Sequence, residues 1–233
     1  MISIIIPTYN ERGNIIRLIT SIASIIRRSA IQGEIIVVDD NSPDGTASAV
    51  KKLSKYAPLP VRLIKRPEKM GLSSAVIDGI AAAKYDVVGV MDADFSHPPE
   101  FIPRLAIPVL KGECDFAIGS RYINGGRIVR WPFSRRAISI GATFLSRPLT
   151  GVKDSVSGYF FFRKDILRNV VLEGIGYKIC LEILVKGKYR EVREIPITFV
   201  NRKEGKSKLD LKECANYVFH LIKLYSHRLR KSV

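Results

Sequence analysis

Three short apolar runs, each followed at once by polar residues, most constrain the fold of this chain. They are Ile2–Ile6, Glu34–Asp39 and Val87–Val90. Unbroken β-branched runs are typical of strands that a parallel sheet buries on both faces. Segments with the apolar spacing of a helix separate these runs, and the connecting loops are short. This alternation predicts an α/β fold, with a mainly parallel sheet and helices on both of its faces.

The same patterns predict the other elements. Up to residue 121 we expect helices over 15–28 and 46–55, a strand over 61–65, a helix from 71–74 to about 83, a helix near 99–111 and a strand over 115–120. After residue 121 the alternation weakens, and 122–134 has no regular pattern. Further on we expect helices over 134–147, 176–185 and 209–230, and strands over 157–162 and 191–200. Pro196 cannot donate to a ladder, so it places the last strand at a sheet edge.

Polar clusters follow three of the expected strands. The clusters are Tyr9–Glu11, Asp39–Asp44 and Asp92–Ser96. Ligands of open parallel sheets bind outside the carboxyl ends of the strands. We therefore expect these clusters, distant in sequence, to meet in one crevice.

Asp92 and Asp94 form an Asp-x-Asp pair directly after a buried strand. Carboxylates without partners are costly to bury, and a divalent cation that bridges to phosphate oxygens is the usual solution. We expect Asp94 to hold the cation, with Ser96 as a weaker neutral ligand, and Asp92 to lie beside a sugar. The alternative is an acidic turn that caps the helix beginning near Pro98.

The second cluster suits a nucleobase. The Asp40 carboxylate can accept hydrogen bonds from the ring N–H groups of a purine or pyrimidine. Pro7, Tyr9 and Glu11 would then form the wall of that pocket and bind the ribose hydroxyls. Alternatively, Asp39 and Asp40 merely cap the turn that follows them.

The charge balance narrows the class of partner. The chain has 38 Lys and Arg against 22 Asp and Glu, a net charge of +16, which attracts nucleic acid, anionic membranes or phosphorylated substrates. Four cations on loops or at element ends are candidates to close over phosphates, although each alone reads as a solvated surface charge. They are Arg121, Lys178, Arg202 and Lys208. A basic nucleic-acid-binding protein is the alternative class, but no helix-turn-helix, zinc-finger or RNP-type pattern supports it.

Cysteine usage and hydropathy bear on the compartment. Cys114, Cys180 and Cys214 are far apart and odd in number, which favours a reducing compartment and ordinary packing roles. The N-terminal segment lacks the features of a signal peptide. No apolar run approaches the ~18 residues that span a bilayer. We expect a protein that is cytosolic or peripheral to a membrane.

Eight stretches, in order along nearly the whole chain, carry a family resemblance. They are 7–12 (PTYNER), 37–46 (VVDDNSPDGT), 71–75 (GLSSA), 91–99 (MDADFSHPP), 119–122 (GSRY), 157–160 (SGYF), 176–178 (GYK) and 202–209 (RKEGKSKL). The chain resembles the inverting GT-A glycosyltransferases of family 2, and among them those that transfer mannose to dolichyl phosphate. The resemblance implies a Rossmann-like GT-A fold over 1–233: a nucleotide-sugar half (1–121), an acceptor-side half (122–208) and a C-terminal basic amphipathic helix (209–233).

The resemblance also implies a set of site residues. The GDP-mannose pocket would consist of Pro7, Tyr9, Glu11, Val38, Asp40, Asp92, Ala93 and Asp94, with Arg202 and Lys208 on the diphosphate. Lys178, a candidate from its charge and position, is expected to join this nucleotide-sugar site. Asp94 and Ser96 would hold Mg²⁺ or Mn²⁺. Arg121, Arg135 and Ser139 would hold the acceptor phosphate, and Asp94, Arg121 and Arg135 would carry catalysis.

The implied reaction is transfer of mannose from GDP-mannose to dolichyl or another polyprenyl phosphate, with inversion. The alternative within this class is a polyprenyl-phosphate glucosyltransferase or a relative that uses a UDP-sugar. Basic apolar segments at 122–150 and in the last helix suit a membrane interface. The alternative is that both pack on the catalytic core and expose only charge. We expect a peripheral protein on the cytoplasmic face, with a small membrane anchoring subunit as a candidate partner.

Overall fold

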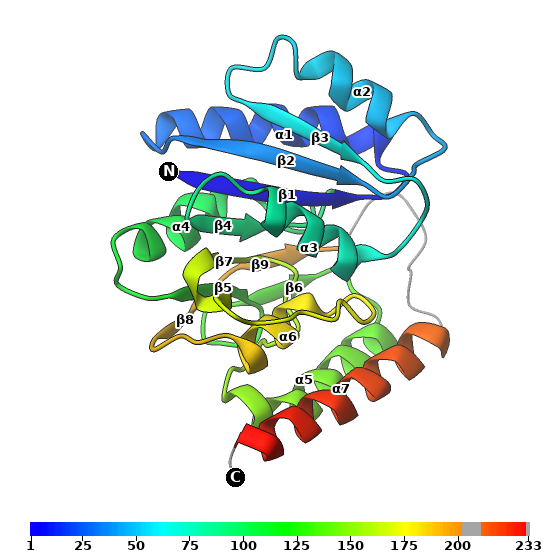
Figure 1. Cartoon of the computed structure of the whole chain (residues 1–233), viewed down its shortest axis with the longest axis vertical. Coiled ribbons are helices and arrows are strands. Elements are labelled where there is room, and N and C mark those ends of the chain that lie inside the picture. Colours follow the sequence, from blue (N-terminus) through cyan, green and yellow to red (C-terminus); the bar gives the residue numbers. More distant parts are fainter. Residues whose placement is uncertain (202–210, 232–233) are drawn as a thin grey trace.

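The computed structural model describes residues 1–201 and 211–231 (Figure 1). Its strands are β1 (Ile2–Thr8), β2 (Gly33–Asp39), β3 (Val61–Lys65), β4 (Val87–Val90), β5 (Phe116–Ser120), β6 (Arg127–Val129), β7 (Phe160–Arg163), β8 (Val192–Pro196) and β9 (Thr198–Val200). Its α-helices are α1 (Arg12–Arg28), α2 (Thr46–Leu53), α3 (Leu72–Ala82), α4 (Ile102–Leu110), α5 (Phe133–Thr150), α6 (Ile179–Lys186) and α7 (Leu211–Lys231). Short 3₁₀ helices lie at Pro99–Phe101 (η1) and Lys164–Leu167 (η2).

In this part of the chain, seven strands form one sheet in the order β3-β2-β1-β4-β7-β5-β8. All neighbouring pairs are parallel except those of β7, which runs antiparallel to both β4 and β5. The prediction of a mixed, mainly parallel sheet with helices on both faces is therefore confirmed. Pro196 ends β8, and β8 is an edge strand, as its proline predicted.

Successive side chains of the central strands enter two different cores, because side chains alternate between the faces of a strand. Ile4 and Ile6 pack with α1 and α4 on one face, whereas Ile5 packs with α3 and α6 on the other. Both faces of β1 are fully buried. This explains why the sequence of this strand is a continuous apolar run rather than an alternating one.

The order of the strands creates a switch point between β1 and β4. From β1 the chain proceeds through α1 to β2 on one side, and from β3 it returns through α3 to β4 on the other. The loops after β1 and β4 therefore leave the sheet in opposite directions and open a crevice at their carboxyl ends. Tyr9–Glu11 and Asp92–Ser96 are those two loops.

Two expectations for the second half were wrong in detail. The strand expected over 191–200 is divided at Ile197, so that β8 joins the large sheet while β9 pairs with β6 in a second, two-stranded sheet. β6 itself lies in the region expected to be irregular. Ile197 is fully buried between the two strands, where the chain passes from one sheet to the other.

Helices α5 and α7 lie side by side at the end of the molecule opposite β3 (Figure 1). The Tyr217 hydroxyl donates to the Ala142 carbonyl at 2.6 Å, and the Tyr225 hydroxyl donates to the Leu145 carbonyl at 2.8 Å. Within residues 1–201 and 211–231, no helix combines the length and the hydrophobicity that crossing a bilayer requires.

Candidate active site

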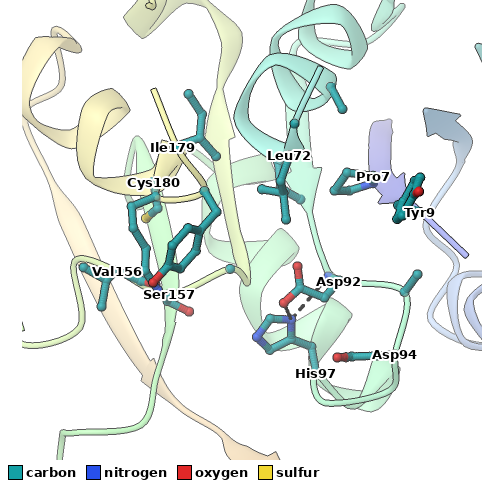
Figure 2. Close-up of a pocket in the computed structure, with 18 of the residues that line it drawn as sticks. Pro7, Tyr9, Leu72, Asp92, Asp94, His97, Val156, Ser157, Ile179 and Cys180 are labelled. Atoms are coloured by element: carbon teal, nitrogen blue, oxygen red, sulfur yellow. Dashed lines mark hydrogen bonds and ion pairs between the residues drawn. The ribbon is translucent and has the colours of Figure 1, made fainter. Parts of the chain in front are cut away.

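A cavity of about 420 Å³ opens at the switch point. All three polar clusters reach it: Pro7–Tyr9 and Glu11 after β1, Asp40 after β2, and Asp92–Asp94 after β4. In Figure 2, Pro7 and Tyr9 lie on one side of Asp92, and Val156 and Ser157 lie on the other. The remaining walls come from α3, α5 and the start of α6.

Asp39 and Asp40 have different roles although they are adjacent. Asp39 caps the following turn, accepting hydrogen bonds from the backbone N–H and hydroxyl of Ser42 at 3.0 and 2.6 Å. Asp40 instead accepts from the backbone N–H groups of Met70 and Gly71 at 2.9 and 2.8 Å, and from the Arg66 guanidinium at 3.0 Å. The capping alternative therefore describes Asp39, whereas Asp40 joins the 66–71 loop to the cavity wall.

Tyr9 and Lys69 form the outer wall at this end. The Lys69 ammonium lies 4.0 Å from the centroid of the Tyr9 ring, a cation–π contact that turns both side chains toward the cavity mouth. Glu11 accepts a hydrogen bond from the Asn14 amide at 3.0 Å. An aromatic face, a cation and carboxylates around one opening suit a flat, polar ligand with an anionic tail.

The loop that carries Asp94 is held in a specific conformation. Phe95 has φ +59°, a left-handed conformation that is costly for a bulky residue. The Arg17 guanidinium lies 4.5 Å from the centroid of the Phe95 ring, and the Ser96 N–H donates to Asp94 Oδ1 at 3.0 Å. The carbonyl of Ser96 also accepts from the Val200 N–H at 3.2 Å. Contacts from α1 and β9 thus stabilise a loop whose own backbone is strained.

The donor set of this loop fits a divalent cation that a ligand helps to bind. In the part of the chain that is described, no group of three or more His, Cys, Asp or Glu side chains could hold a metal ion alone. Mg²⁺ commonly takes one or two protein carboxylates and completes its shell with phosphate oxygens and water. Asp94 at the cavity, with Ser96 two residues away, matches that kind of site.

Asp92 lies against His97 and Gly158. Nδ1 of His97 accepts the Asp92 N–H at 3.3 Å and lies 3.5 Å from Asp92 Oδ2. Burial lowers the pKa of His97, which favours the neutral ring that this hydrogen bond requires. A Cβ on Gly158 would lie 3.0 Å from both Asp92 Oδ2 and His97 Cε1, so a larger residue here would force these side chains to shift by a few tenths of an ångström. The fixed Asp92 carboxylate lines the cavity.

Arg121 is buried and already paired. Its Nε and Nη2 donate to the two oxygens of Asp154 at 2.8 and 2.7 Å, and its backbone N–H donates to Oδ2 at 2.8 Å. Its guanidinium also lies 5.5 Å from the Trp131 ring centroid and 5.4 Å from that of Phe199. Burial disfavours the cation, but the contact with Asp154 more than compensates and raises the pKa of Arg121. The remaining N–H groups give this wall a permanent positive charge.

Arg135, Ser139 and Lys178 complete this wall. Arg135 lies 4.8 Å from the Trp131 ring centroid and donates to Asn201 Oδ1 at 3.3 Å. The Ser139 hydroxyl accepts from the Tyr122 hydroxyl at 2.8 Å. The Lys178 ammonium donates to the Val156 carbonyl at 3.4 Å, and desolvation lowers its pKa to about 8. Cationic and apolar groups alternate here, which suits an anionic head group on an apolar chain.

Most of the predicted site residues line this one cavity. They are Pro7, Tyr9, Glu11, Asp40, Asp92, Ala93, Asp94, Arg121, Arg135, Ser139 and Lys178. Val38 and Ser96 do not line it: Val38 is fully buried in the core, and Ser96 is buried behind Asp94. Arg202 and Lys208 lie outside the described residues.

Several lining residues were not expected. They include Lys69, His97, Trp131, Val156, Ser157, Tyr177, Cys180 and Phe199. His97, Ser157 and Tyr177 belong to stretches that carried the family resemblance, so a signal for them existed. Cys180 packs in the core, as expected, and also lines the cavity. Lys69 and Phe199 carried no sequence signal, because only the folded chain brings them to the opening.

The sequence matches one known family of enzymes over most of its length. Residues 3–171 match the model of "Glycosyl transferase family 2". This match spans more than half of the chain, so the chain belongs to glycosyl transferase family 2.

Individual relatives with known names indicate a narrower group within this family. The chain is 47% identical over 228 residues to a dolichol-phosphate mannosyltransferase from Pyrococcus furiosus, covering 96% of this chain and 63% of that protein. It is 40% identical over 233 residues to the dolichol-phosphate mannosyltransferase of Saccharomyces cerevisiae, covering 96% of this chain and 86% of that protein. The chain thus spans less than two thirds of the Pyrococcus relative.

Solved structures share the GT-A fold. Glucosyl-3-phosphoglycerate synthase from Mycobacterium tuberculosis is 21% identical, with a TM-score of 0.67 over 98% of this chain and 79% of that one. A mannosyltransferase from Pyrobaculum calidifontis, in complex with GDP-Man and Mn²⁺, is 18% identical, with a TM-score of 0.58 over 98% of this chain and 64% of that one. These likenesses confirm the predicted fold.

The Arg121–Asp154 pair makes one stability prediction. Asp154→Asn leaves the buried Arg121 cation without its counter-charge, so we expect a loss of about 3 kcal/mol in unfolding free energy. Asp165→Asn is the matched control, because Asp165 pairs with Arg163 at 2.7 Å in a half-exposed position where such pairs contribute roughly 0.5 kcal/mol. Urea denaturation measures both. Equal losses in the two variants would contradict the importance of the buried pair.

Proposed function

We propose that this chain transfers mannose from GDP-mannose to dolichyl phosphate or another polyprenyl phosphate. The observation that carries the proposal is the convergence of the acidic clusters and of Arg121, Arg135 and Lys178 on one cavity. The end with Tyr9, Asp40 and Asp94 suits a nucleotide diphosphate. Relatives that are 38–47% identical to this chain over the aligned residues are named dolichol-phosphate mannosyltransferases.

The proposed reaction is a single displacement at the anomeric carbon. A phosphate oxygen of the lipid attacks that carbon from the face opposite GDP, while the bond from the carbon to the β-phosphate oxygen breaks and its electron pair leaves with GDP. α-Linked GDP-mannose thereby gives a β-mannosyl phosphate. The second pKa of a phosphate monoester is about 6, so the nucleophile is already deprotonated at neutral pH and needs no strong general base.

The protein's task is then to bring two anions together in the correct orientation. Arg121 and Arg135 would bind the acceptor phosphate and reduce its repulsion from the donor. Lys178 would bind the donor diphosphate, together with Arg202 and Lys208 from outside the described residues. Asp94 would hold Mg²⁺ or Mn²⁺, and the charge of that ion would stabilise GDP as it leaves.

Nucleic-acid binding is less well supported than this reaction. The cavity is lined by carboxylates of Glu11, Asp40, Asp92 and Asp94 as well as by cations. A phosphate backbone would be repelled by that acidic side unless a metal intervened. A nucleotide-sugar donor would use both the carboxylates, through a bound metal, and the cations, through direct contacts with its phosphates.

The test is transfer from radiolabelled GDP-mannose to dolichyl phosphate with Mg²⁺, followed by solvent extraction of the lipid. Wild-type protein is expected to label the lipid, and Asp94→Ala is expected to lose transfer while its thermal midpoint stays unchanged. Lys52→Ala, exposed on α2 and away from the cavity lining, controls for non-specific loss and should retain transfer. Labelling from UDP-glucose instead would establish the alternative donor, and metal-dependent transfer by Asp94→Ala would refute the assigned metal role.

The pKa of Lys178 predicts an alkaline limit on donor use. Desolvation lowers this pKa to about 8, so the ammonium loses its charge, and its attraction for phosphate, above that pH. We expect kcat/KM for GDP-mannose to be flat just below pH 8 and to fall about tenfold per pH unit above it, since kcat/KM reports the free enzyme. Lys178→Arg keeps its charge and should remove this limit. An unchanged profile in that variant would assign the limit to another group.

The acceptor is a lipid, so we further propose that α5 and α7 lie on the cytoplasmic face of a membrane. Apolar side chains of both helices are exposed rather than packed on the core: Phe133, Ile138, Ile140, Phe144 and Leu145 on α5, and Val218, Phe219, Ile222 and Leu229 on α7. The alternative that these segments expose only charge is therefore wrong. Basic side chains flank this face, as in helices that bind at lipid interfaces.

Flotation with vesicles of anionic phospholipid tests the membrane proposal. Wild-type protein is expected to float, and Phe144→Asp with Phe219→Asp is expected to reduce floating at least tenfold by placing charges in the apolar layer. Tyr56→Asp is the matched control, because Tyr56 is more exposed than either phenylalanine but lies after α2 at the other end of the molecule. Failure of wild-type protein to float would instead favour recruitment by a small membrane subunit.

A further inference from the structure

Residues 173–178, which we call the lysine segment, lead into the cavity wall and end at Lys178. Gly176, Tyr177 and Lys178 line the cavity, and α6 begins at the next residue. Gly174 and Gly176 have φ of +66° and +65°, the left-handed region that glycine adopts without strain. Such a segment has little conformational preference of its own, so its position must be set by contacts from elsewhere.

Glu182 makes those contacts. It lies one helical turn after Lys178, is fully buried, and accepts hydrogen bonds from the backbone N–H groups of Glu173 at 2.6 Å and Gly174 at 3.0 Å. It also accepts from the Lys186 ammonium at 2.8 Å. One buried carboxylate thus binds the beginning of the lysine segment, while the end of the segment is joined to the same helix.

Other charged groups surround this carboxylate. Lys186 also donates to Glu173 Oε1 at 3.0 Å and to the Val171 carbonyl at 3.2 Å. From α7, Lys223 donates to Glu173, and Nε2 of His220 lies 3.7 Å from Glu182 Oε2. Among the described residues, neither ring nitrogen of the buried His220 has a hydrogen-bond partner. The helix that carries the exposed apolar face therefore packs against the same cluster.

A buried ion pair is a weak source of stability. Replacing such a pair with apolar residues of similar volume is often neutral or stabilising, because desolvation offsets the attraction between the charges. Packing α6 against its neighbours therefore does not require a carboxylate at 182. An apolar side chain, however, cannot accept the two N–H groups of the lysine segment.

We propose that Glu182 is a positioning residue that fixes the lysine segment so that the Lys178 ammonium stays in the cavity. The inference rests on the proposed function, since it assigns Lys178 to the donor diphosphate. Glu182 does not line the cavity and acts on the reaction only through this segment. Loss of its two backbone contacts should therefore affect the donor side more than the turnover of bound substrate.

The decisive variant is Glu182→Met with Lys186→Met, which removes both charges and keeps similar volumes. We expect its thermal midpoint to remain near that of the wild type. Hydrogen exchange of the Glu173 and Gly174 amides should accelerate at least tenfold. The donor KM should rise about tenfold or more with a smaller change in kcat, and the alkaline limit near pH 8 should move upward as Lys178 becomes more hydrated. Glu113→Gln, in an exposed pair with Arg193, is the matched control and should change none of these quantities.

The results for these variants support or contradict the positioning role of Glu182. A folded double variant with unchanged donor KM and an unchanged pH limit would overturn it, whether or not the amides exchange faster. If the double variant does not fold, Glu182→Gln replaces it, because the glutamine keeps one acceptor oxygen. This variant must raise the donor KM, by less than tenfold, and must also move the alkaline pH limit upward. If wild-type protein does not transfer mannose, the proposed function fails instead. In that case the inference is judged by amide exchange and by calorimetric GDP binding, which must weaken about tenfold in the double variant.

Discussion

The parallel pairing of β1 with β4 determines where the rest of the site lies. The two strands are followed by connections that leave the sheet in opposite directions, so the crevice between their ends is a consequence of strand order. Both strands are buried on both faces, so polar side chains that contact a ligand must lie beyond the strand ends. Tyr9, Glu11, Asp92 and Asp94 therefore gather at one opening although more than eighty residues separate the two loops.

Charge pairing determines which groups around that opening remain available to a ligand. Asp40 is held by Arg66 and two backbone N–H groups, Arg121 by Asp154, and Glu182 by Lys186. These groups are buried, and buried charges need such partners. Lys178 differs, because its hydrogen bond to the neutral Val156 carbonyl is long, at 3.4 Å, and desolvation lowers its pKa to about 8. A phosphate ligand would add negative charge beside this ammonium and favour its protonated form.

The first half of the fold was predictable, and the second half was less so, for identifiable reasons. The apolar runs of β1 to β4 are local signals, and β3 begins and ends at the predicted residues. The insertion of β7 between β4 and β5 depends on pairing between distant residues, and the division at Ile197 depends on a change of sheet. In the site, Asp-x-Asp and the strand-end clusters were visible in the sequence. Asp154 and Glu182 were not, because a partner for Arg121 or for two backbone N–H groups exists only in the folded chain.

We propose that the three polar clusters form one site for a guanosine diphosphate bound through a metal. Calorimetric titration of GDP, with and without Mn²⁺, tests this site. We expect saturable binding of one GDP per chain with Mn²⁺, and binding at least tenfold weaker without the metal or with Asp94→Ala. No binding of GDP in either condition, or equal binding by wild type and Asp94→Ala, would contradict it.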